Sequence, residues 1–168
     1  MDRARISAWV AALLSLPLAG CEDDVQTTLT AYETLRVALA SERLESVAGY
    51  ASDLASKAHD GEDQVEEKLR YHMQELAGAA RQLGARGAIS LATARRDFQE
   101  VSRHVVALLE ADLEKREGYH LFECATLDGY QRWVQATPDV ASPYGEAGDE
   151  ACGTPAKWAG GDCPFDHF

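Results

Sequence analysis

The chain has 168 residues, which is enough for one domain. Hydrophobic residues make up 46% of it and charged residues 26%, a composition typical of folded globular proteins and not of disordered ones. The formal net charge of −12 excludes nucleic acid and anionic lipid headgroups as favourable partners, because an acidic surface repels both.

Residues 1–20 have the pattern of a targeting segment and are set apart from the fold. A short basic region precedes an apolar stretch, 6–18, that is too short to span a bilayer. The stretch ends in Leu18-Ala19-Gly20-Cys21, which resembles the lipobox of bacterial lipoproteins. The resemblance implies cleavage before Cys21 and lipid attachment to its thiol, and a secretory signal cut near Ala19 is the alternative.

This interpretation predicts a cell-envelope lipoprotein whose folded domain is tethered to a membrane by lipid. Because Glu22 and not Asp follows the cysteine, we expect the outer membrane, facing the periplasm. The chain then divides into a signal peptide (1–20), a folded domain (21–153) and an irregular tail (154–168).

Four segments upstream of residue 118 carry apolar residues at the three-and-four spacing of amphipathic helices. We expect helices over 22–40, 41–61, 62–83 and 90–113. Their short connections predict an all-α, four-helix up-down bundle. The expected buried positions are Val25, Leu29, Tyr32, Leu35 and Leu39; Leu44, Val47, Ala51, Leu54 and Ala58; Val65, Leu69, His72 or Met73, Leu76, Ala80 and Leu83; and Leu91, Ala94, Phe98, Val101, Val105, Leu108 and Asp112 or Leu113.

Local signals mark the expected helix ends. Ser41 and Ser90 are suited to N-cap positions, because a serine hydroxyl can accept a hydrogen bond from a free backbone N–H of the first turn. Gly61 is suited to the left-handed position after a helix. The acidic residues that follow it favour the start of the third helix.

His72 and His104 lie on or beside the apolar stripes. No Cys, Asp or second His shares the local face of either residue in the helical pattern. We therefore expect both to be histidines at the edge of the core and not metal ligands.

The periodicity changes after Gly118. Residues 119–124 and 130–134 have strand-like composition, and Asp128-Gly129 between them is a turn signal. We expect a short β-hairpin packed on the bundle, with His120, Phe122 and Cys124 on one face. Residues 136–168 are rich in glycine and proline, which predicts a loop-rich tail.

Several of these residues carry a family resemblance. Leu29-Thr30-Ala31-Tyr32 lies in the first helix and Arg95, Phe98 and Ser102 in the fourth, and Cys124, Trp133, Pro143-Tyr144 and Cys152-Gly153 follow in that order. Over roughly residues 25–153 this pattern resembles the bacterial envelope family described as domain of unknown function 3347. That domain also occurs on periplasmic adaptor subunits of copper and silver efflux pumps, so the resemblance implies a heavy-metal association. The chain departs from the pattern at two methionines, since Ala125-Thr126 and Asp149 stand about where these are expected. A soft cuprous ion prefers such thioether ligands.

The C-terminal segment holds the candidate metal ligands, which are His120, Cys124, Cys152, Cys163 and His167. Sulfur and imidazole ligands suit copper or zinc, although the spacing lacks the tight Cys pairs of structural zinc sites. The competing interpretation is a disulfide, which an oxidising envelope compartment favours. Bridging Cys124 to Cys152 closes a loop of 28 residue steps and contributes about 3–4 kcal/mol by loop entropy. We expect this pairing, with Cys152–Cys163 as the alternative.

The aromatic residues Phe122, Tyr130, Trp133 and Tyr144 have two interpretations, an exposed binding patch or, as we favour, the core beneath the hairpin. No nucleophile elbow, phosphate-binding glycine loop or HExxH motif is present, so we expect no enzymatic activity. Two functions remain: an envelope lipoprotein that binds or senses a heavy metal through its C-terminal segment, or a non-catalytic module that docks on another envelope protein.

Overall fold

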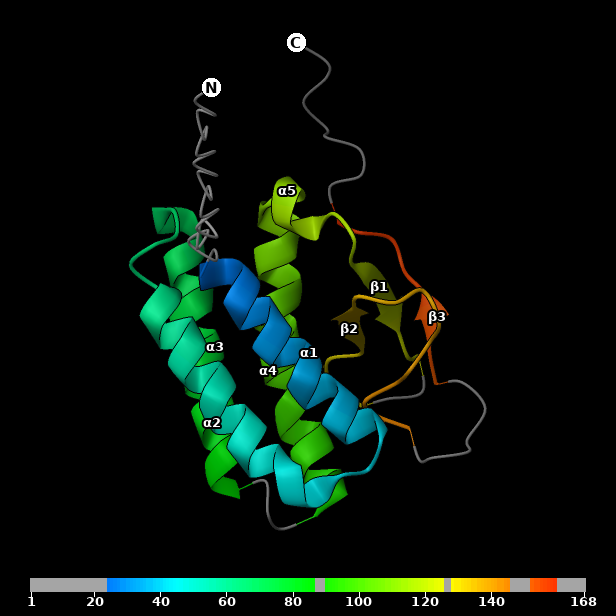
Figure 1. Ribbon diagram of the computed structural model, residues 1–168. Helices are drawn as coiled ribbons and strands as arrows, with labels where there is room; N and C mark the ends of the chain where they lie inside the picture. Colours follow the sequence, from blue (N-terminus) through cyan, green and yellow to red (C-terminus); the bar gives the residue numbers. More distant parts are fainter. Residues whose placement is uncertain (1–23, 87–89, 126–127, 146–151, 160–168) are drawn as a thin grey trace, which may run out of the picture.

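Four long helices lie side by side, and a small antiparallel sheet covers one side of them (Figure 1). The computed structural model describes residues 24–86, 90–125, 128–145 and 152–159. The expected helical bundle with a C-terminal β element and a cystine-tied segment is confirmed. The helices are α1 (Asp24–Ala40), α2 (Leu44–Gly61), α3 (Glu67–Arg86), α4 (Leu91–Ala111) and the short α5 (Leu113–Arg116). The strands are β1 (His120–Glu123), β2 (Arg132–Gln135) and β3 (Thr154–Pro155).

Each long helix packs mainly against its neighbours in sequence. The pairs α1–α2, α2–α3 and α3–α4 make extensive contacts, whereas α1 and α4 touch sparsely. Strand β2 packs against α4, and the sheet lies beside α1 and α4 (Figure 1). The sheet and the helices therefore share one hydrophobic core.

The apolar stripes are buried as the periodicity predicts, except near some helix starts and at the fourth helix's end. Leu44, Val65 and Leu91 are only partly buried, and Leu113 is 62% exposed because α4 ends at Ala111. In the third helix Met73 is fully buried and His72 is not, which resolves the alternative left open by the sequence.

The N-cap prediction is confirmed at Ser90 and wrong at Ser41. The Ser90 hydroxyl accepts a hydrogen bond from the backbone N–H of Thr93 at 3.1 Å. Around Ser41 the chain instead completes α1, because the N–H groups of Glu42 and Arg43 donate to the carbonyls of Leu39 and Ala38. This helix C-cap places Glu42 in the left-handed region with φ 57°, so α2 begins only at Leu44.

The second helix ends at Gly61 as expected, but the predicted left-handed conformation of Gly61 is wrong. Gly61 is the last residue of α2, and Glu62 after it keeps helical angles, so no left-handed residue ends this helix. A Cβ atom at Gly61 would lie 2.9 Å from Met73 Cε and 3.2 Å from Asp24 Cβ, so a larger residue here would have to displace the end of the Met73 side chain. The third helix begins at Glu67 and not at Glu62.

The sheet has the strand order β2–β1–β3. In the β1–β2 pair Phe122 lies opposite Trp133, and in the β1–β3 pair Phe122 lies opposite Pro155. The third strand, in the segment expected to be irregular, was not predicted because two residues carry no periodic signal. The connection between β1 and β2, residues 124–131, is longer than the stretch 125–129 that the expected strands left between them.

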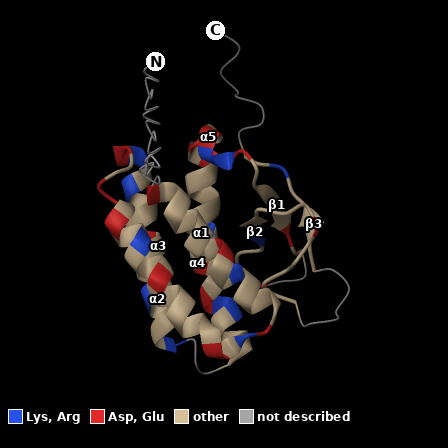
Figure 2. Ribbon diagram, viewed as in Figure 1, with Lys and Arg blue, Asp and Glu red and all other residues tan. Residues whose placement is uncertain are grey.

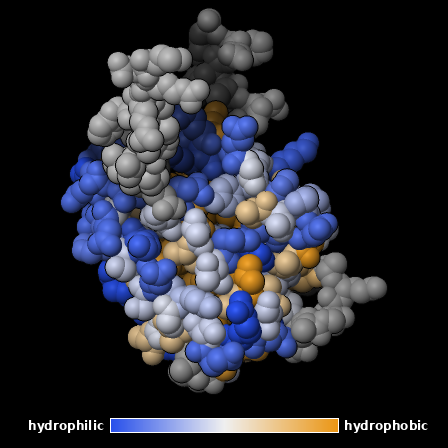
Figure 3. Space-filling model, viewed as in Figure 1, coloured by the Kyte–Doolittle hydropathy of each residue, from blue (hydrophilic) through white to orange (hydrophobic). Residues whose placement is uncertain are grey.

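The surface is hydrophilic over most of the face in Figure 3, and acidic and basic residues alternate over the outer sides of the helices in Figure 2. The large hydrophobic residues exposed in the described chain are Tyr71, Leu113 and Val140, which lie on separate elements. Within residues 24–159, as far as they are described, no helix is both long and apolar enough to cross a membrane.

Candidate functional site

A disulfide bond joins Cys124, directly after β1, to Cys152, two residues before β3. The pairing expected from the sequence is thus confirmed over the Cys152–Cys163 alternative. Cys124 is 2% exposed and Cys152 is partly buried, so the bond joins the core to the edge of the C-terminal segment. It ties together the ends of the segment that contains β2 and its following loop.

The cystine changes the predicted set of metal ligands. Cys124 and Cys152 have no free thiolate while they are bonded to each other, and metal ligation requires the thiolate. His120 is exposed at the first position of β1, whereas Phe122 and Cys124 are buried. Cys163, His167 and the predicted lipid-attachment residue Cys21 lie outside the described residues. Among the described positions no group of three His, Cys, Asp or Glu residues is arranged to hold a metal ion.

Three of the four residues of the predicted aromatic patch are buried. Phe122 stacks on Trp133 with ring centroids 5.7 Å apart, and Tyr144 packs edge-on against Trp133 at the same distance. The series continues into the bundle through Phe98 and Tyr32, whose rings stack at 5.4 Å. These residues form the core beneath the sheet, which is the interpretation that the sequence favoured.

Tyr130 differs from the other three aromatic residues because it is partly exposed. The Arg103 guanidinium lies over its ring, 5.3 Å from the centroid. Burial of the phenol, together with the nearby Glu110 carboxylate, raises the pKa of Tyr130 to about 12. The hydroxyl therefore stays protonated at any physiological pH.

The Tyr32 hydroxyl connects α1, α4 and β2. It lies 3.0 Å from Ser102 Oγ and 3.3 Å from both the N and the O of Val134. Because β2 is an edge strand, this hydroxyl satisfies backbone groups that no neighbouring strand pairs with. Burial raises the pKa of Tyr32 far above its ordinary value, so the hydroxyl remains a proton donor.

Polar side chains of the bundle hold the loops around the sheet. Arg36, only 2% exposed, pairs with Glu33 and donates to the carbonyl of Ala141. Arg95 donates to the carbonyl of Pro143 at 3.2 Å and pairs with Glu42 at 3.1 Å. These contacts fix the loop after β2, where the chain has no regular structure of its own.

The buried side chain of Gln135 organises the same loop from inside. Its Oε1 accepts from Trp133 Nε1 at 3.1 Å and from the N–H of Ala141 at 3.2 Å. Its Nε2 donates to the carbonyls of Thr137 and Asp139. Sequence reasoning missed this residue, because a glutamine in a short strand gives no sign of burial.

The residues that carry the family resemblance meet at this junction of bundle and sheet. They are Tyr32, Arg95, Phe98, Ser102, Cys124, Trp133, Pro143, Tyr144, Cys152 and Gly153. A Cβ at Gly153 would lie 2.7 Å from the Trp133 ring, which explains a glycine after the second cysteine. Packing and hydrogen bonding thus account for the spacing of these residues without any ligand.

A second candidate site lies between α3 and α4. Nδ1 of His72 is 3.5 Å from Nδ1 of His104, and the edge of the Tyr71 ring packs against both imidazoles. Both histidines are partly buried at the edge of the core, as expected, but each also contacts a second histidine from the neighbouring helix, which the pattern of its own helix did not show. The signal for this contact was present in the sequence: each histidine directly precedes a stripe residue, Met73 or Val105, so pairing the two stripes brings the histidines together.

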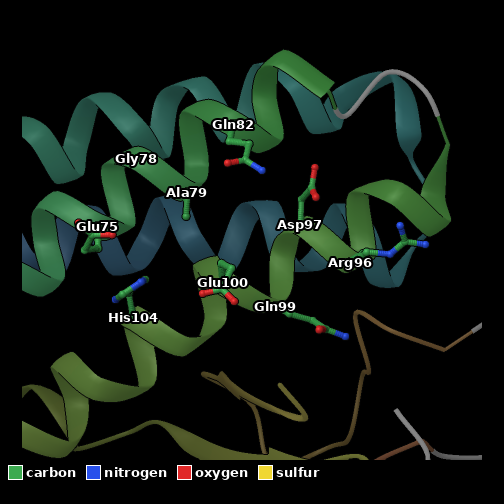
Figure 4. Close-up of a pocket in the computed structure, with 9 residues that line it drawn as sticks. All are labelled: Glu75, Gly78, Ala79, Gln82, Arg96, Asp97, Gln99, Glu100 and His104. Carbon is green, nitrogen blue, oxygen red and sulfur yellow. The ribbon is translucent and has the colours of Figure 1, made fainter. Parts of the chain in front are cut away.

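His104 opens onto a hollow of about 520 Å³ along the groove between these helices (Figure 4). Gly78 and Ala79 line its α3 side between Glu75 and Gln82. Glu75 and Glu100 lie near the His104 end, and Arg96 lines the α4 side towards the other end. Further along, Oδ2 of Asp97 is buried with no hydrogen-bond partner in the described structure, while Oδ1 is 3.6 Å from Arg86. Burial and the neighbouring His72 lower the pKa of His104, and the two carboxylates act in the opposite direction.

Comparisons of the chain with models of protein families, with curated proteins and with solved structures find no match. The resemblance to the envelope family and the lipoprotein assignment therefore stay predictions.

Proposed function

We propose that the protein is a lipid-anchored, non-catalytic interaction module of the cell envelope that binds its partner through the surface of the helical bundle. The Cys124–Cys152 disulfide carries the proposal, since structural cystines persist in oxidising compartments such as the periplasm. The Leu18-Ala19-Gly20-Cys21 sequence independently predicts export and lipid attachment.

The bundle surface is favoured as the docking surface for two reasons. The aromatic residues of the C-terminal segment are largely buried in the core, so they form no exposed patch for a partner. The described bundle also holds its sheet rigidly through the disulfide and the Tyr32, Arg36 and Arg95 contacts, as suits a scaffold. The partner is expected to be an envelope protein, because the predicted lipid anchor would hold the domain at an envelope membrane and the charge disfavours nucleic acid.

The experiment is intact mass spectrometry and thiol counting on the protein isolated from native membranes. We expect an acylated Cys21 as the first residue, a Cys124–Cys152 bridge and one free thiol, that of Cys163. Cys21→Ala is expected to release the protein from the membrane fraction, whereas Cys163→Ala should leave it there. An unmodified N-terminus elsewhere, or three free thiols, would contradict the proposal.

Metal binding by the C-terminal segment is the second candidate function, and the family resemblance favours it. With the cystine formed, copper or zinc has His120, Cys163 and His167 as ligands, too few for tight binding. We expect weak binding that strengthens when the disulfide is reduced. Stoichiometric copper or zinc in the oxidised native protein, lost in His120→Gln, would place this function ahead of the first.

A further inference from the structure

We propose that His72 of α3 and His104 of α4 chelate one divalent transition-metal ion, such as Zn²⁺, at the end of the α3–α4 hollow. This site is separate from the C-terminal ligands and goes beyond the interaction function proposed above. Two observations carry it: the spacing of the two imidazole nitrogens, and the chemistry of the hollow into which His104 opens.

The spacing of the two nitrogens fits one metal ion. Zinc binds imidazole nitrogen at about 2.0–2.1 Å in a tetrahedral arrangement, which requires about 3.3–3.4 Å between two ligand nitrogens. The Nδ1 atoms of His72 and His104 are 3.5 Å apart. A direct hydrogen bond at that distance would be long, since such bonds cluster near about 2.9–3.0 Å. The contact is therefore better matched to a shared ion than to a shared proton.

The two rings come from different helices, 32 residues apart, so a bound ion would link α3 to α4.

Carboxylates surround the pair on the hollow side. Glu75 lies three residues after His72 and Glu100 four residues before His104, spacings that place each on the same helix face as its histidine. Both line the hollow with His104 (Figure 4). The unpartnered, buried Oδ2 of Asp97 adds a further acceptor along the same groove. These three carboxylates outnumber the Arg96 guanidinium that lines the same hollow, so the charge of the hollow favours a cation. Arg103 on α4 also interacts electrostatically with His104 and acts against a bound cation.

The site is open and not fully formed. The described residues contain no arranged group of three ligands, so the two imidazoles are the protein's ligands and water completes the coordination. Zinc sites that retain an open position hold water or substrate there, whereas structural sites are closed. We therefore infer a reversible zinc-binding site and not a metal required for folding.

The experiment measures zinc binding by calorimetry on the oxidised mature chain carrying Cys163→Ser and His167→Gln, which removes the tail's ligands. ZnSO₄ is the probe. One equivalent is expected, and His72→Gln or His104→Gln should each weaken its binding at least tenfold. The matched controls are His59→Gln, at an exposed position of α2, and His120→Gln, on β1; both should bind as the parent does.

Nuclear magnetic resonance of the imidazole nitrogens identifies the ligands without substitution, in case a variant folds poorly. Zinc should shift the Nδ1 resonances of His72 and His104 and leave that of His59 unchanged. Absence of zinc binding, equal affinity in parent and His72→Gln, or loss of binding in His120→Gln alone would each overturn the proposal. Failure of membrane anchoring would leave this site untouched, so the two proposals are tested separately.

Discussion

The helical bundle and the β-sheet share one hydrophobic core, yet different kinds of contact stabilise them. The four helices bury long apolar stripes in which many residues make similar contributions. The sheet has short strands and depends on a few specific contacts: one disulfide, one run of aromatic rings and one tyrosine hydroxyl. Stability is therefore distributed in the bundle and concentrated at single residues in the sheet, which makes the two regions respond differently to substitution.

The largest effect is expected where both regions meet. Phe98 is fully buried on α4 and packs against Tyr32 and Tyr144. Phe98→Ala should lower the free energy of unfolding by about 3–5 kcal/mol, because it removes apolar burial and leaves a cavity. Chemical denaturation measures the effect, and Leu113→Ala at an exposed apolar position is the control. Equal stability of the two variants would contradict the burial described for α4.

Removal of the disulfide should distinguish the sheet from the bundle more sharply than Phe98→Ala does. Replacing Cys124 and Cys152 by serine should cost about 3–4 kcal/mol, because the loop of 28 residues is no longer restrained in the unfolded chain. The loss should fall on the sheet and is measured by amide hydrogen exchange. The amides of Cys124 and Ala156, which donate to the carbonyls of Gln131 and Leu121, should exchange faster. The amides of α2 and α3 should keep the ranking of protection that they have in the parent. Cys163→Ser is the control, and uniform loss of protection would show that the sheet and bundle unfold as one unit.

The same contrast explains what could be predicted from the sequence. The helices follow from the spacing of Leu29, Tyr32, Phe98 and Val101, because a burial pattern repeated over many residues tolerates local error. The strand β3 and the role of Gln135 could not be predicted, since they depend on contacts between distant segments. The disulfide pairing could be inferred because three cysteines leave few alternatives.

Some of the predicted helix boundaries are wrong for a related reason. Ser41 satisfies the chemistry of an N-cap, but the same stretch also ends α1, and the backbone bonds of Glu42 and Arg43 to α1 carbonyls prevail. The His72–His104 pair was missed because it joins two helices: the stripe of one helix, taken alone, does not show the histidine that the neighbouring stripe brings beside it.

An intermediate loss of stability is expected when the Tyr32 hydroxyl, which bonds to the edge of β2, is removed. Tyr32→Phe keeps the ring stacking on Phe98 but leaves the Ser102 hydroxyl and the backbone of Val134 buried without their partner. The cost should be about 1–3 kcal/mol in denaturation. Tyr119→Phe is the matched control, because its hydroxyl accepts one long, exposed hydrogen bond, from Gln26 at 3.4 Å. Similar losses in both variants would mean that the edge of β2 does not depend on Tyr32.

The smallest effect concerns the bundle alone and depends on pH. Burial and His72 hold the pKa of His104 below its ordinary value of 6.5 in the folded state. Below pH 6.5, His104 takes up a proton more readily in the unfolded chain than in the folded one. The stability contributed by neutral His104 is therefore complete above pH 6.5 and is lost as the pH drops towards the folded pKa.

The groups facing His104 are His72 and Tyr71 on α3, Glu75 beside them, and Glu100 and Arg103 on α4 itself. The carboxylates oppose the shift and His104 is only half buried, which keeps the effect small. Urea midpoints measured in chelator from about pH 7.5 to about pH 5.5 should fall less for His104→Gln than for the parent or for the exposed-site control His59→Gln. The sheet's amides should show no such dependence on His104, because the histidine pair joins α3 to α4 and lies away from the disulfide and the aromatic rings that hold the sheet. Parallel midpoint curves for parent and His104→Gln would show that the contact between the two imidazoles adds no pH sensitivity to the bundle.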